Sequence, residues 1–267
     1  MTNLLTRLFL TAVLTVVCGI SVCAQPAIGK VTDSNDLYYS IVNGSAQWVE
    51  VTYPGDLPRG MWDGYEKPAG HIFFPAAITY EGKRFSLHEI AAWTFMGCKG
   101  ITGVELSEGL NSIGFSAFAL CDGLTSVTVP LSVKFLGGCM FFGCRNLQEA
   151  TLPPDVKELM EHTFADCYSL RKVVLPEKLQ LIDRSAFDRS GIESITIPAG
   201  VTFIGENAFR ECKNLRSIEV KAVRPPALGE DAFVGVSAET VVYVPQGCAN
   251  AYREDPDWSN FQDIRER

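Results

Sequence analysis

Five cysteines recur at one position of a repeated Phe-x-x-Cys motif, and thiols at a fixed spacing could form disulfides or bind a metal. They are Cys98, Cys121, Cys144, Cys167 and Cys212. In one copy Ser190 replaces the cysteine, so the position requires a small side chain and not a thiol. Equivalent positions of stacked strands lie about 4.8 Å apart with parallel side chains, which suits S–S geometry poorly. We therefore expect buried free thiols, with disulfides between repeats as the alternative. Cys139 and Cys248 lie outside this series and have no obvious partners.

Other residue types that support catalysis do not form a recognisable set. His71, His88 and His162 share no common spacing. The sequence has no Gly-x-Ser-x-Gly elbow, no phosphate-binding glycine loop and no paired Cys-x-x-Cys metal motif. Asp255-Pro-Asp257 lacks the spaced oxygens and the glycine of an EF-hand loop. We expect a protein with no catalytic residues, no metal site and no cofactor.

The cysteines belong to a repeat whose most regular member is a phenylalanine. The seven phenylalanines follow one another at intervals of 23, 23, 23, 23, 22 and 24 residues: Phe95, Phe118, Phe141, Phe164, Phe187, Phe209 and Phe233. A fixed period of this length is typical of a solenoid, in which each turn buries its apolar side against the next turn. We expect every phenylalanine to lie in the core.

Each repeat divides into a strand and a turn. From Gly123 to Pro130 the residues alternate, with Val127 and Val129 predicted to point inward and Ser126 and Thr128 outward. The proline that follows ends the strand, because it lacks a backbone donor. Segments such as Ser-Ala-Phe are predicted to form one turn of helix or 3₁₀ helix. Stacked strands would form one parallel sheet along a face of the coil.

The repeat "L-x-x-V-x-L-P-x-x-V-x-x-I-x-x-x-A-F-x-x-C", visible from Ile195 to Cys212, resembles that of the BspA-like leucine-rich repeat proteins of bacteria. The resemblance implies an α+β solenoid, a right-handed coil of about six to seven repeats of 22–24 residues with a parallel β-sheet face. It covers residues 85–236, and the flanks resemble caps: a β-rich N-terminal cap at 25–84, with hairpins around Asn43-Gly44 and at 78–85, and a strand and helix at 237–267. It also implies a binding role without catalysis, as in adhesion.

Residues 1–24 are predicted to be a cleaved signal peptide. Arg7 precedes an apolar run at 8–17 that is too short to span a membrane, and small residues surround Ala24. The protein would be exported and then secreted, periplasmic or held at the cell surface, with a lipid anchor on Cys18 or Cys23 as the lesser alternative. Removal of one arginine changes the net charge from −8 to −9. This acidity argues against nucleic acid and anionic membranes as partners.

The outward face of the predicted sheet is the first candidate binding surface, because repeat proteins commonly bind partners there. Its candidate residues are Glu105, Thr128, Thr151, Lys172, Thr196, Glu219 and Tyr243. The alternative is that threonine and serine occur here because they suit a solvated strand.

A long loop rich in proline and glycine, at 54–70, is the second candidate. It carries Met61, Trp62 and Tyr65, which no strand pattern requires. Exposed aromatic residues often anchor interfaces, so Trp62 and Tyr65, together with the neighbouring Met61, are candidate binding residues. Alternatively, the loop is a flexible insertion and Trp62 packs against the N-terminal cap.

Two functions remain open. The first is an exported interaction protein, a monomer that binds a protein or extracellular matrix partner on a host or microbial surface. The second is a carbohydrate-binding module, for which Trp62, Tyr65 and Tyr243 would supply the aromatic platform.

Overall fold

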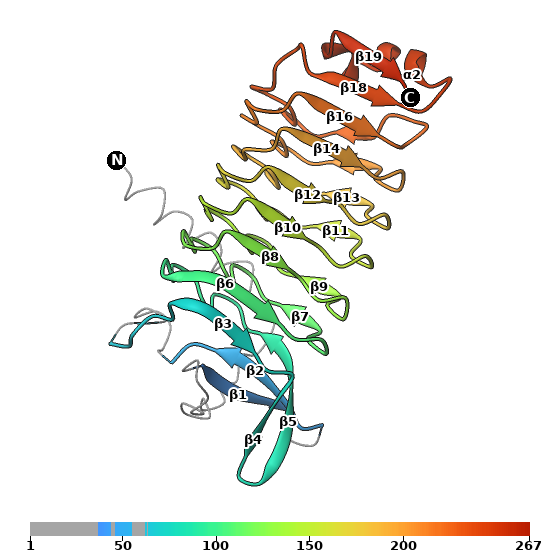
Figure 1. Cartoon of the computed structure of the whole chain (residues 1–267). Coiled ribbons are helices and arrows are strands. Elements are labelled where there is room, and N and C mark those ends of the chain that lie inside the picture. The colour runs from blue at the N-terminus through green and yellow to red at the C-terminus, as the bar shows by residue number, and fades with distance from the viewer. Residues whose placement is uncertain (1–36, 44–45, 55–61, 63) are drawn as a thin grey trace.

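The chain coils into a β-solenoid of about eight turns (Figure 1). The computed structural model describes residues 37–43, 46–54, 62 and 64–267. The predicted signal peptide and Met61 lie outside the described residues. The predicted solenoid is confirmed, with more turns than the expected six to seven. The helical component is smaller than expected, because α2 (Ala249–Glu254) is the only α-helix in the described part of the chain.

One strand of each turn contributes to a long parallel array, here called the front sheet. In order along the solenoid its strands are β3 (Gly70–Phe74), β6 (Ile101–Leu106), β8 (Ser126–Thr128), β10 (Glu149–Thr151), β12 (Lys172–Val174), β14 (Ser194–Ile197), β16 (Ser217–Val220), β18 (Val241–Val244) and β19 (Asp263–Glu266). Backbone pairing joins them as β3–β6, β8–β10–β12 and β14–β16–β18–β19. The three groups lie edge to edge and follow one another along the solenoid. The alternation predicted from the sequence is confirmed, since Val127 and Val129 are buried and Thr128 is exposed.

A second row of short parallel strands, the second sheet, lies behind the front sheet and was not predicted. It consists of β5 (Lys83–Ile90), β7 (Ser112–Ile113), β9 (Phe135–Leu136), β11 (Glu158–Leu159), β13 (Leu181–Ile182), β15 (Phe203–Ile204) and β17 (Ala227–Leu228). Six of these are only two residues long, so their sequence carries no alternation to detect. Val133 and Leu136, which follow the proline that ends β8, are buried beneath this row.

Two antiparallel pairs precede the regular coil. β1 (Tyr38–Asn43) pairs with β2 (Trp48–Thr52), and β4 (Ala77–Tyr80) pairs with β5. β2 in turn pairs in parallel with β5, so both pairs attach to the N-terminal end of the second sheet. The front sheet already begins at β3, upstream of Phe85.

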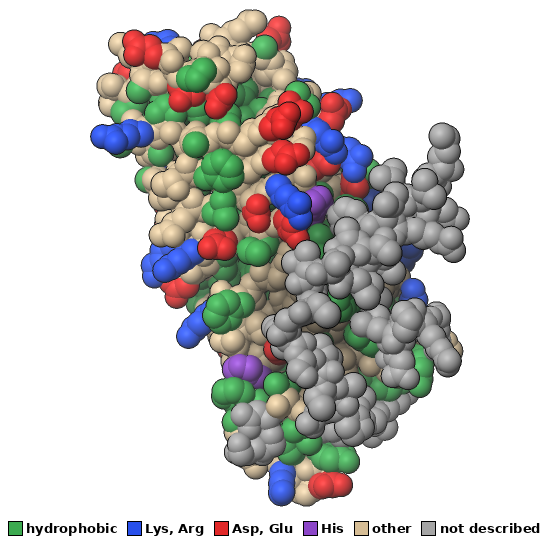
Figure 2. Space-filling model, turned by 180° about the vertical axis from the view of Figure 1, so that it is seen from behind, with side chains coloured by type: hydrophobic (Ala, Val, Ile, Leu, Met, Phe, Trp, Pro, Cys, Tyr) green, Lys and Arg blue, Asp and Glu red, His purple; other side chains and the backbone are tan. Residues whose placement is uncertain are grey.

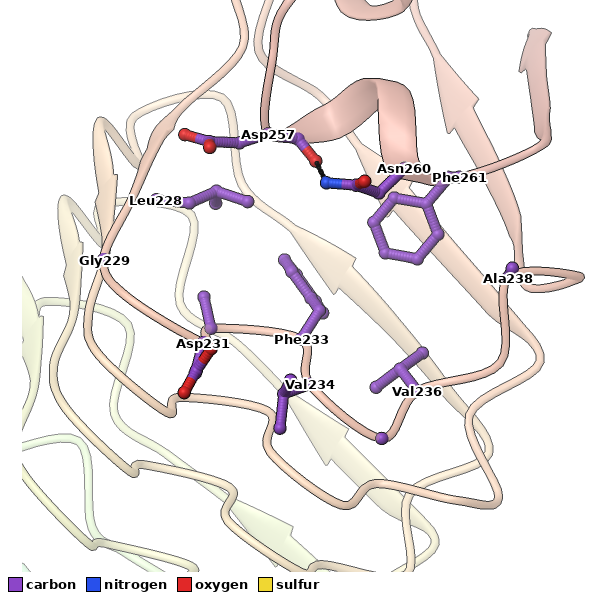
Figure 3. Close-up of a pocket in the computed structure, with 12 residues that line it drawn as sticks. Leu228, Gly229, Asp231, Phe233, Val234, Val236, Ala238, Asp257, Asn260 and Phe261 are labelled. Carbon is purple, nitrogen blue, oxygen red and sulfur yellow. Dashed lines mark hydrogen bonds between the residues drawn. The ribbon is translucent and has the colours of Figure 1, made fainter.

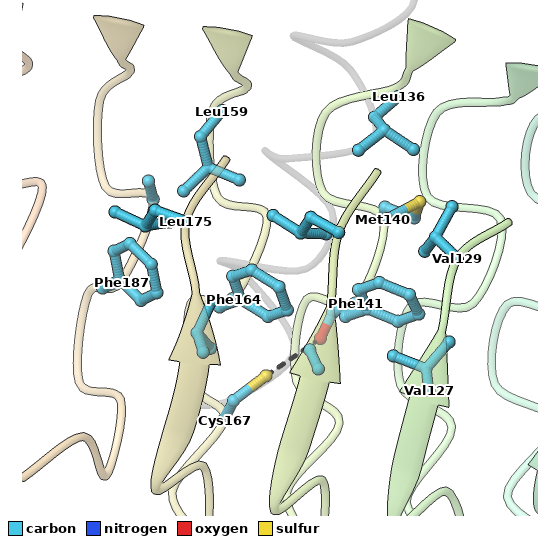
Figure 4. Close-up of a cluster of buried hydrophobic side chains, with 14 of the residues drawn as sticks. Val127, Val129, Leu136, Met140, Phe141, Leu159, Phe164, Cys167, Leu175 and Phe187 are labelled. Carbon is cyan, nitrogen blue, oxygen red and sulfur yellow. Dashed lines mark hydrogen bonds between the residues drawn. The ribbon is translucent and has the colours of Figure 1, made fainter. Parts of the chain in front are cut away.

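The phenylalanines form a continuous column of stacked rings inside the coil (Figure 4). The rings from Phe95 to Phe209 are fully buried, and successive centroids lie 5.0–6.0 Å apart with interplanar angles of 20° or less. Each interior ring therefore contacts one ring above and one below. The predicted position in the core is confirmed for these six rings, whereas the seventh, Phe233, is half buried.

Each phenylalanine lies in a tight turn, here called a phenylalanine turn, and not in the predicted helix. The residues two before and two after the ring have left-handed backbone angles, as in Ser116 (φ 53°) and Leu120 (φ 60°) around Phe118. Left-handed residues interrupt a right-handed helix. The amides at these three positions instead bond to the next turn, as when Phe118 donates to the Met140 carbonyl over 3.1 Å.

The cysteine column has a specific hydrogen-bonding role in the core. Four thiols donate to the carbonyl of the phenylalanine one turn earlier, for example Cys167 Sγ to Phe141 O over 3.1 Å (Figure 4). Cysteine is thus both small enough for the space and able to satisfy a buried acceptor. All seven described cysteines are free, which confirms the expectation of thiols over disulfides.

We predict that the five column thiols resist alkylation in the native protein and react in denaturant. Burial raises the pKa of the Cys98 and Cys212 thiols to about 12, so the reactive thiolate is scarce at neutral pH. Cys248, which is only half buried, is expected to react first in the native state. Mass spectrometry after timed alkylation measures this order, and disulfide-linked column peptides from the folded protein would contradict it.

The N-terminal end contains a carboxylate whose ionisation opposes folding. Burial and the neighbouring Glu89 raise the pKa of Glu50 to about 7, although Ser40 donates a hydrogen bond that lowers it. The folded state therefore binds a proton more tightly than the unfolded state, and stability is lost as pH rises from about 4.5 to about 7. We predict that Glu50→Gln flattens this part of the stability curve and raises the melting temperature at pH 8. A variant with the unchanged pH slope would contradict the assignment.

Candidate functional site

The outward side chains of the front sheet form two straight rows, here called the front face. Strand register fixes these rows: Ser126, Glu149 and Lys172 are direct neighbours in one, and Thr128, Thr151 and Val174 in the other. Farther along, Thr196, Glu219, Tyr243 and Arg265 continue the second row. The seven predicted front-face residues thus lie on one surface.

Exposure on the front face decreases toward the C-terminal end. Glu105, Thr128, Thr151 and Lys172 are exposed, whereas Thr196, Glu219 and Tyr243 are half buried. Thr196 donates to the Glu219 carboxylate over 3.2 Å, and the Arg267 guanidinium lies 5.4 Å from the centre of the Tyr243 ring. The middle of the face, from β8 to β12, therefore offers exposed hydroxyl and charged groups, and its C-terminal end is already engaged in local contacts.

The sequence did not predict several residues of this face. β3 adds His71 and Phe73, and Phe73 is 44% exposed opposite Glu105. Val174, by contrast, follows from the strand alternation, and it is 60% exposed in the middle of the face. β19 adds Asp263 and Arg265, which form an ion pair at 2.5 Å. The alternation of Ile72 and Phe74 with His71 and Phe73 was a usable signal for β3, but no phenylalanine repeat surrounds it.

Trp62 lies in the core, so the expectation of an exposed anchor is wrong. The alternative, in which Trp62 packs against the N-terminal cap, agrees with its edge-on contact with Tyr38 of β1. Trp62 is 5% exposed, and its indole N–H donates to the Thr94 carbonyl over 2.8 Å. Its ring stacks on Phe95 with centroids 6.4 Å apart, at the open end of the ring column. In every later turn, the carbonyl of the residue before the ring accepts a hydrogen bond from the preceding turn. Thr94 holds this position in the first turn, which has no preceding turn to donate. Trp62 therefore takes the place of the missing preceding turn.

Tyr65 remains on the surface. It is 47% exposed and packs edge-on against Tyr38, with ring centroids 5.9 Å apart. Lys67, close by in sequence, reaches the Gly97 carbonyl at 3.3 Å, so this segment lies over the first phenylalanine turn and away from the front face. The two candidate surfaces are separate.

The three histidines have three different environments. His71 lies 4.0 Å from Glu105 on the front face, and His88 stacks on Trp48 with ring centroids 4.1 Å apart. His162 occupies a left-handed position of the fourth phenylalanine turn, where burial lowers its pKa. Within the described ranges, no cluster of three or more His, Cys, Asp or Glu side chains is placed to hold a metal ion.

The phenylalanine-turn side of the coil carries ion pairs between successive turns. Arg189 contacts Asp166 at 2.7 Å, and Arg210 contacts Asp188 at 2.7 Å. Figure 2 shows acidic and basic side chains next to each other on this side of the molecule. These pairs link neighbouring turns, and their mixed signs produce no strong local field for a polyanionic ligand.

Comparison of the sequence with protein families finds one match. The model described as BspA type leucine-rich repeat region matches residues 88–216 in six copies. No curated protein matches the chain. The described residues include no helix that is long and apolar enough to cross a membrane.

Two solved structures show the same fold. A leucine-rich cell surface protein from Faecalibacterium prausnitzii superposes with a TM-score of 0.57 at 21% identity, covering 88% of this chain and 75% of the other. A leucine-rich repeat protein from Treponema pallidum superposes with a TM-score of 0.64 at 22% identity, covering 84% of this chain and 94% of the other. At these identities the similarity is one of fold.

Proposed function

Because the chain belongs to the BspA-type leucine-rich repeat family, we propose that it is an exported, non-catalytic scaffold that binds a protein partner through its front face. The observation that supports this most directly is the register of the two outward rows. A partner would meet unpaired hydroxyl, carboxylate and ammonium groups at a regular spacing, on a backbone that is held rigid by the ring column beneath it.

Placement outside the cell is the second part of the proposal. The predicted signal peptide at 1–24 supports export, and the similar protein from F. prausnitzii is described as a cell surface protein. An adhesion-like role at a host or microbial surface is consistent with both. Tyr65 would form a separate, secondary contact with the partner, because it is exposed but does not lie on the front face.

A carbohydrate-binding module is the alternative. Sugars are commonly held against exposed aromatic rings, and Phe73 and Tyr243 lie on the front face at its two ends. Trp62 cannot contribute a ring to such a platform, because it is buried. The polar middle of the face has no aromatic ring among the described strands β8 to β16, so the protein partner is the better-supported proposal.

We predict that three lysines on the front face strongly weaken partner binding and leave the fold intact. The variant is Thr128→Lys, Thr151→Lys and Thr196→Lys, which places three charges along strands whose inward side chains are unchanged. The partner is first identified by pull-down from host and bacterial surface extracts, beside a glycan array. Titration of that partner should then show a loss of at least about tenfold in affinity.

The matched control puts the same three charges on the second-sheet side, as Phe135→Lys, Gln180→Lys and Thr202→Lys, all at exposed positions. This control variant should bind like the parent. A separate variant, Tyr65→Ala, tests the secondary contact at Tyr65. If the front-face variant also binds like the parent, the front face is not the site. Binding to the glycan array alone would favour the carbohydrate alternative.

A further inference from the structure

The phenylalanine turns form a hydrogen-bonded ladder that is left open at its C-terminal end. In each of six successive steps, the amides two before, at and two after the ring donate to the next turn over 2.7–3.1 Å. The seventh turn repeats the geometry, with Asp231 at φ 55° and Gly235 at φ 81° around Phe233. Among the described residues, no group accepts a hydrogen bond from the backbone amides of Asp231, Phe233 and Gly235.

These amides border a cleft of about 450 Å³ between the seventh turn and the C-terminal segment (Figure 3). Phe233, Val236 and Phe261 give it an apolar lining, and Leu228 and Ala238 lie at its edges. The ring column itself ends beneath the cleft, because Trp258 and Phe261 pack on Phe233 with centroids 5.6 and 5.3 Å away. The C-terminal segment thus covers the rings without supplying the missing carbonyls.

We propose that this cleft binds an extended, cationic peptide segment of a partner protein. The backbone of such a segment would present carbonyls at alternate residues, the spacing that every following turn presents to the turn before it. One apolar side chain would contact Phe233 and Phe261. Asp231 and Asp257 line the same cleft and form no ion pair within the described chain, so a Lys or Arg of the segment would meet them.

Other occupants fit the cleft less well. The three donors lie on alternate residues and do not converge on a point, and the two aspartates would repel an anion. A second copy stacked head to tail would need the first-turn carbonyl of Thr94, which Trp62 already occupies. Two C-terminal ends placed together would oppose donor to donor. A partner that brings its own carbonyls and a positive charge avoids all three problems.

The test uses an acetylated and amidated peptide of four Lys-Val repeats, added to isotope-labelled protein and followed by NMR. We expect the Asp231, Phe233 and Gly235 amide signals to shift in a saturable manner. A peptide of four Glu-Val repeats should bind at least about tenfold more weakly because of the aspartates. Asp231→Asn should narrow that difference without unfolding the turn, since Asn207 occupies the equivalent position one turn earlier.

A blocking variant and its control complete the test. Ala238→Trp is expected to fill the cleft and eliminate the shifts, whereas Ala199→Trp, at an exposed site after β14, should leave them unchanged. Shifts confined to the front face would overturn the proposal. So would equal binding of both peptides, or shifts of these amides with protein concentration alone, which would indicate a second copy. Protection of the three amides that disappears when residues 25–36 are deleted would instead identify the chain's own N-terminal segment as the occupant.

Discussion

Replacing Phe164 with alanine is expected to lower the free energy of unfolding by about 3–5 kcal/mol, the usual range for removal of a buried aromatic ring. The ring is fully buried, and its centroid lies 5.7 Å from that of Phe141 and 5.5 Å from that of Phe187. The substitution therefore leaves a cavity in the middle of the column and removes contacts from both neighbouring turns. Neither turn can close the gap, because backbone hydrogen bonds fix their spacing.

Chemical denaturation measures this change, and Phe135→Ala supplies the matched control. Phe135 is 65% exposed on β9, so the same deletion there should cost less than about 1 kcal/mol. The midpoint of Phe164→Ala should fall clearly below those of the parent and the control. Equal midpoints for the two variants would show that the ring column contributes little to stability.

Replacing Trp62 with alanine is expected to destabilise the protein by a similar amount, about 3–5 kcal/mol, although the residue belongs to a surface loop in sequence. Its ring covers Phe95 and its indole N–H satisfies the Thr94 carbonyl. Trp62→Phe keeps most of the ring and loses the donor, so it should cost about 1–3 kcal/mol, the penalty of a buried acceptor left unpaired.

Tyr65→Ala is the control for this prediction, because Tyr65 is nearby in sequence and 47% exposed. It should leave the unfolding midpoint within about 0.5 kcal/mol of the parent. Hydrogen exchange gives a local measurement. Within the Trp62→Ala variant, the amides of the first phenylalanine turn should exchange faster than those of the fourth turn. If the Trp62→Ala variant is as stable as the Tyr65→Ala variant, Trp62 is not part of the core and is again a candidate binding residue.

The repeated part of the fold could be predicted because its signals recur. Phe95 to Phe233 return at nearly constant intervals, and a side chain that fills the same space in each turn must return at the same interval. The alternation around Val127 and the proline after each strand predicted the front sheet in the same way. The Ser190 substitution similarly identified the cysteine column as a packing position, which the free thiols confirm.

The ends of the molecule could not be predicted in this manner, because each end occurs once. Trp62 has no repeated counterpart, so its sequence position in a proline- and glycine-rich segment pointed to the surface. Its burial follows from a need that appears only when the coil is assembled, namely an uncovered ring and an unpaired carbonyl at the first turn. β19 was missed for the same reason: one strand at the end of the chain has no repeat to reveal it.

The turn conformation was also decided by the tertiary structure. Ser-Ala-Phe suits a helical turn locally, but the amides around each phenylalanine bond to the next turn and so require the left-handed residues on either side. By itself the sequence determined the period, the inward ring and thiol columns, and the polar front face, because all three depend on side-chain type at fixed spacing. Only the tertiary structure decided which groups at the two ends were satisfied. Trp62 closes one end, and the amides of Asp231, Phe233 and Gly235 stay open at the other, because the amides of the phenylalanine turns all donate toward the next turn and the seventh turn has no successor.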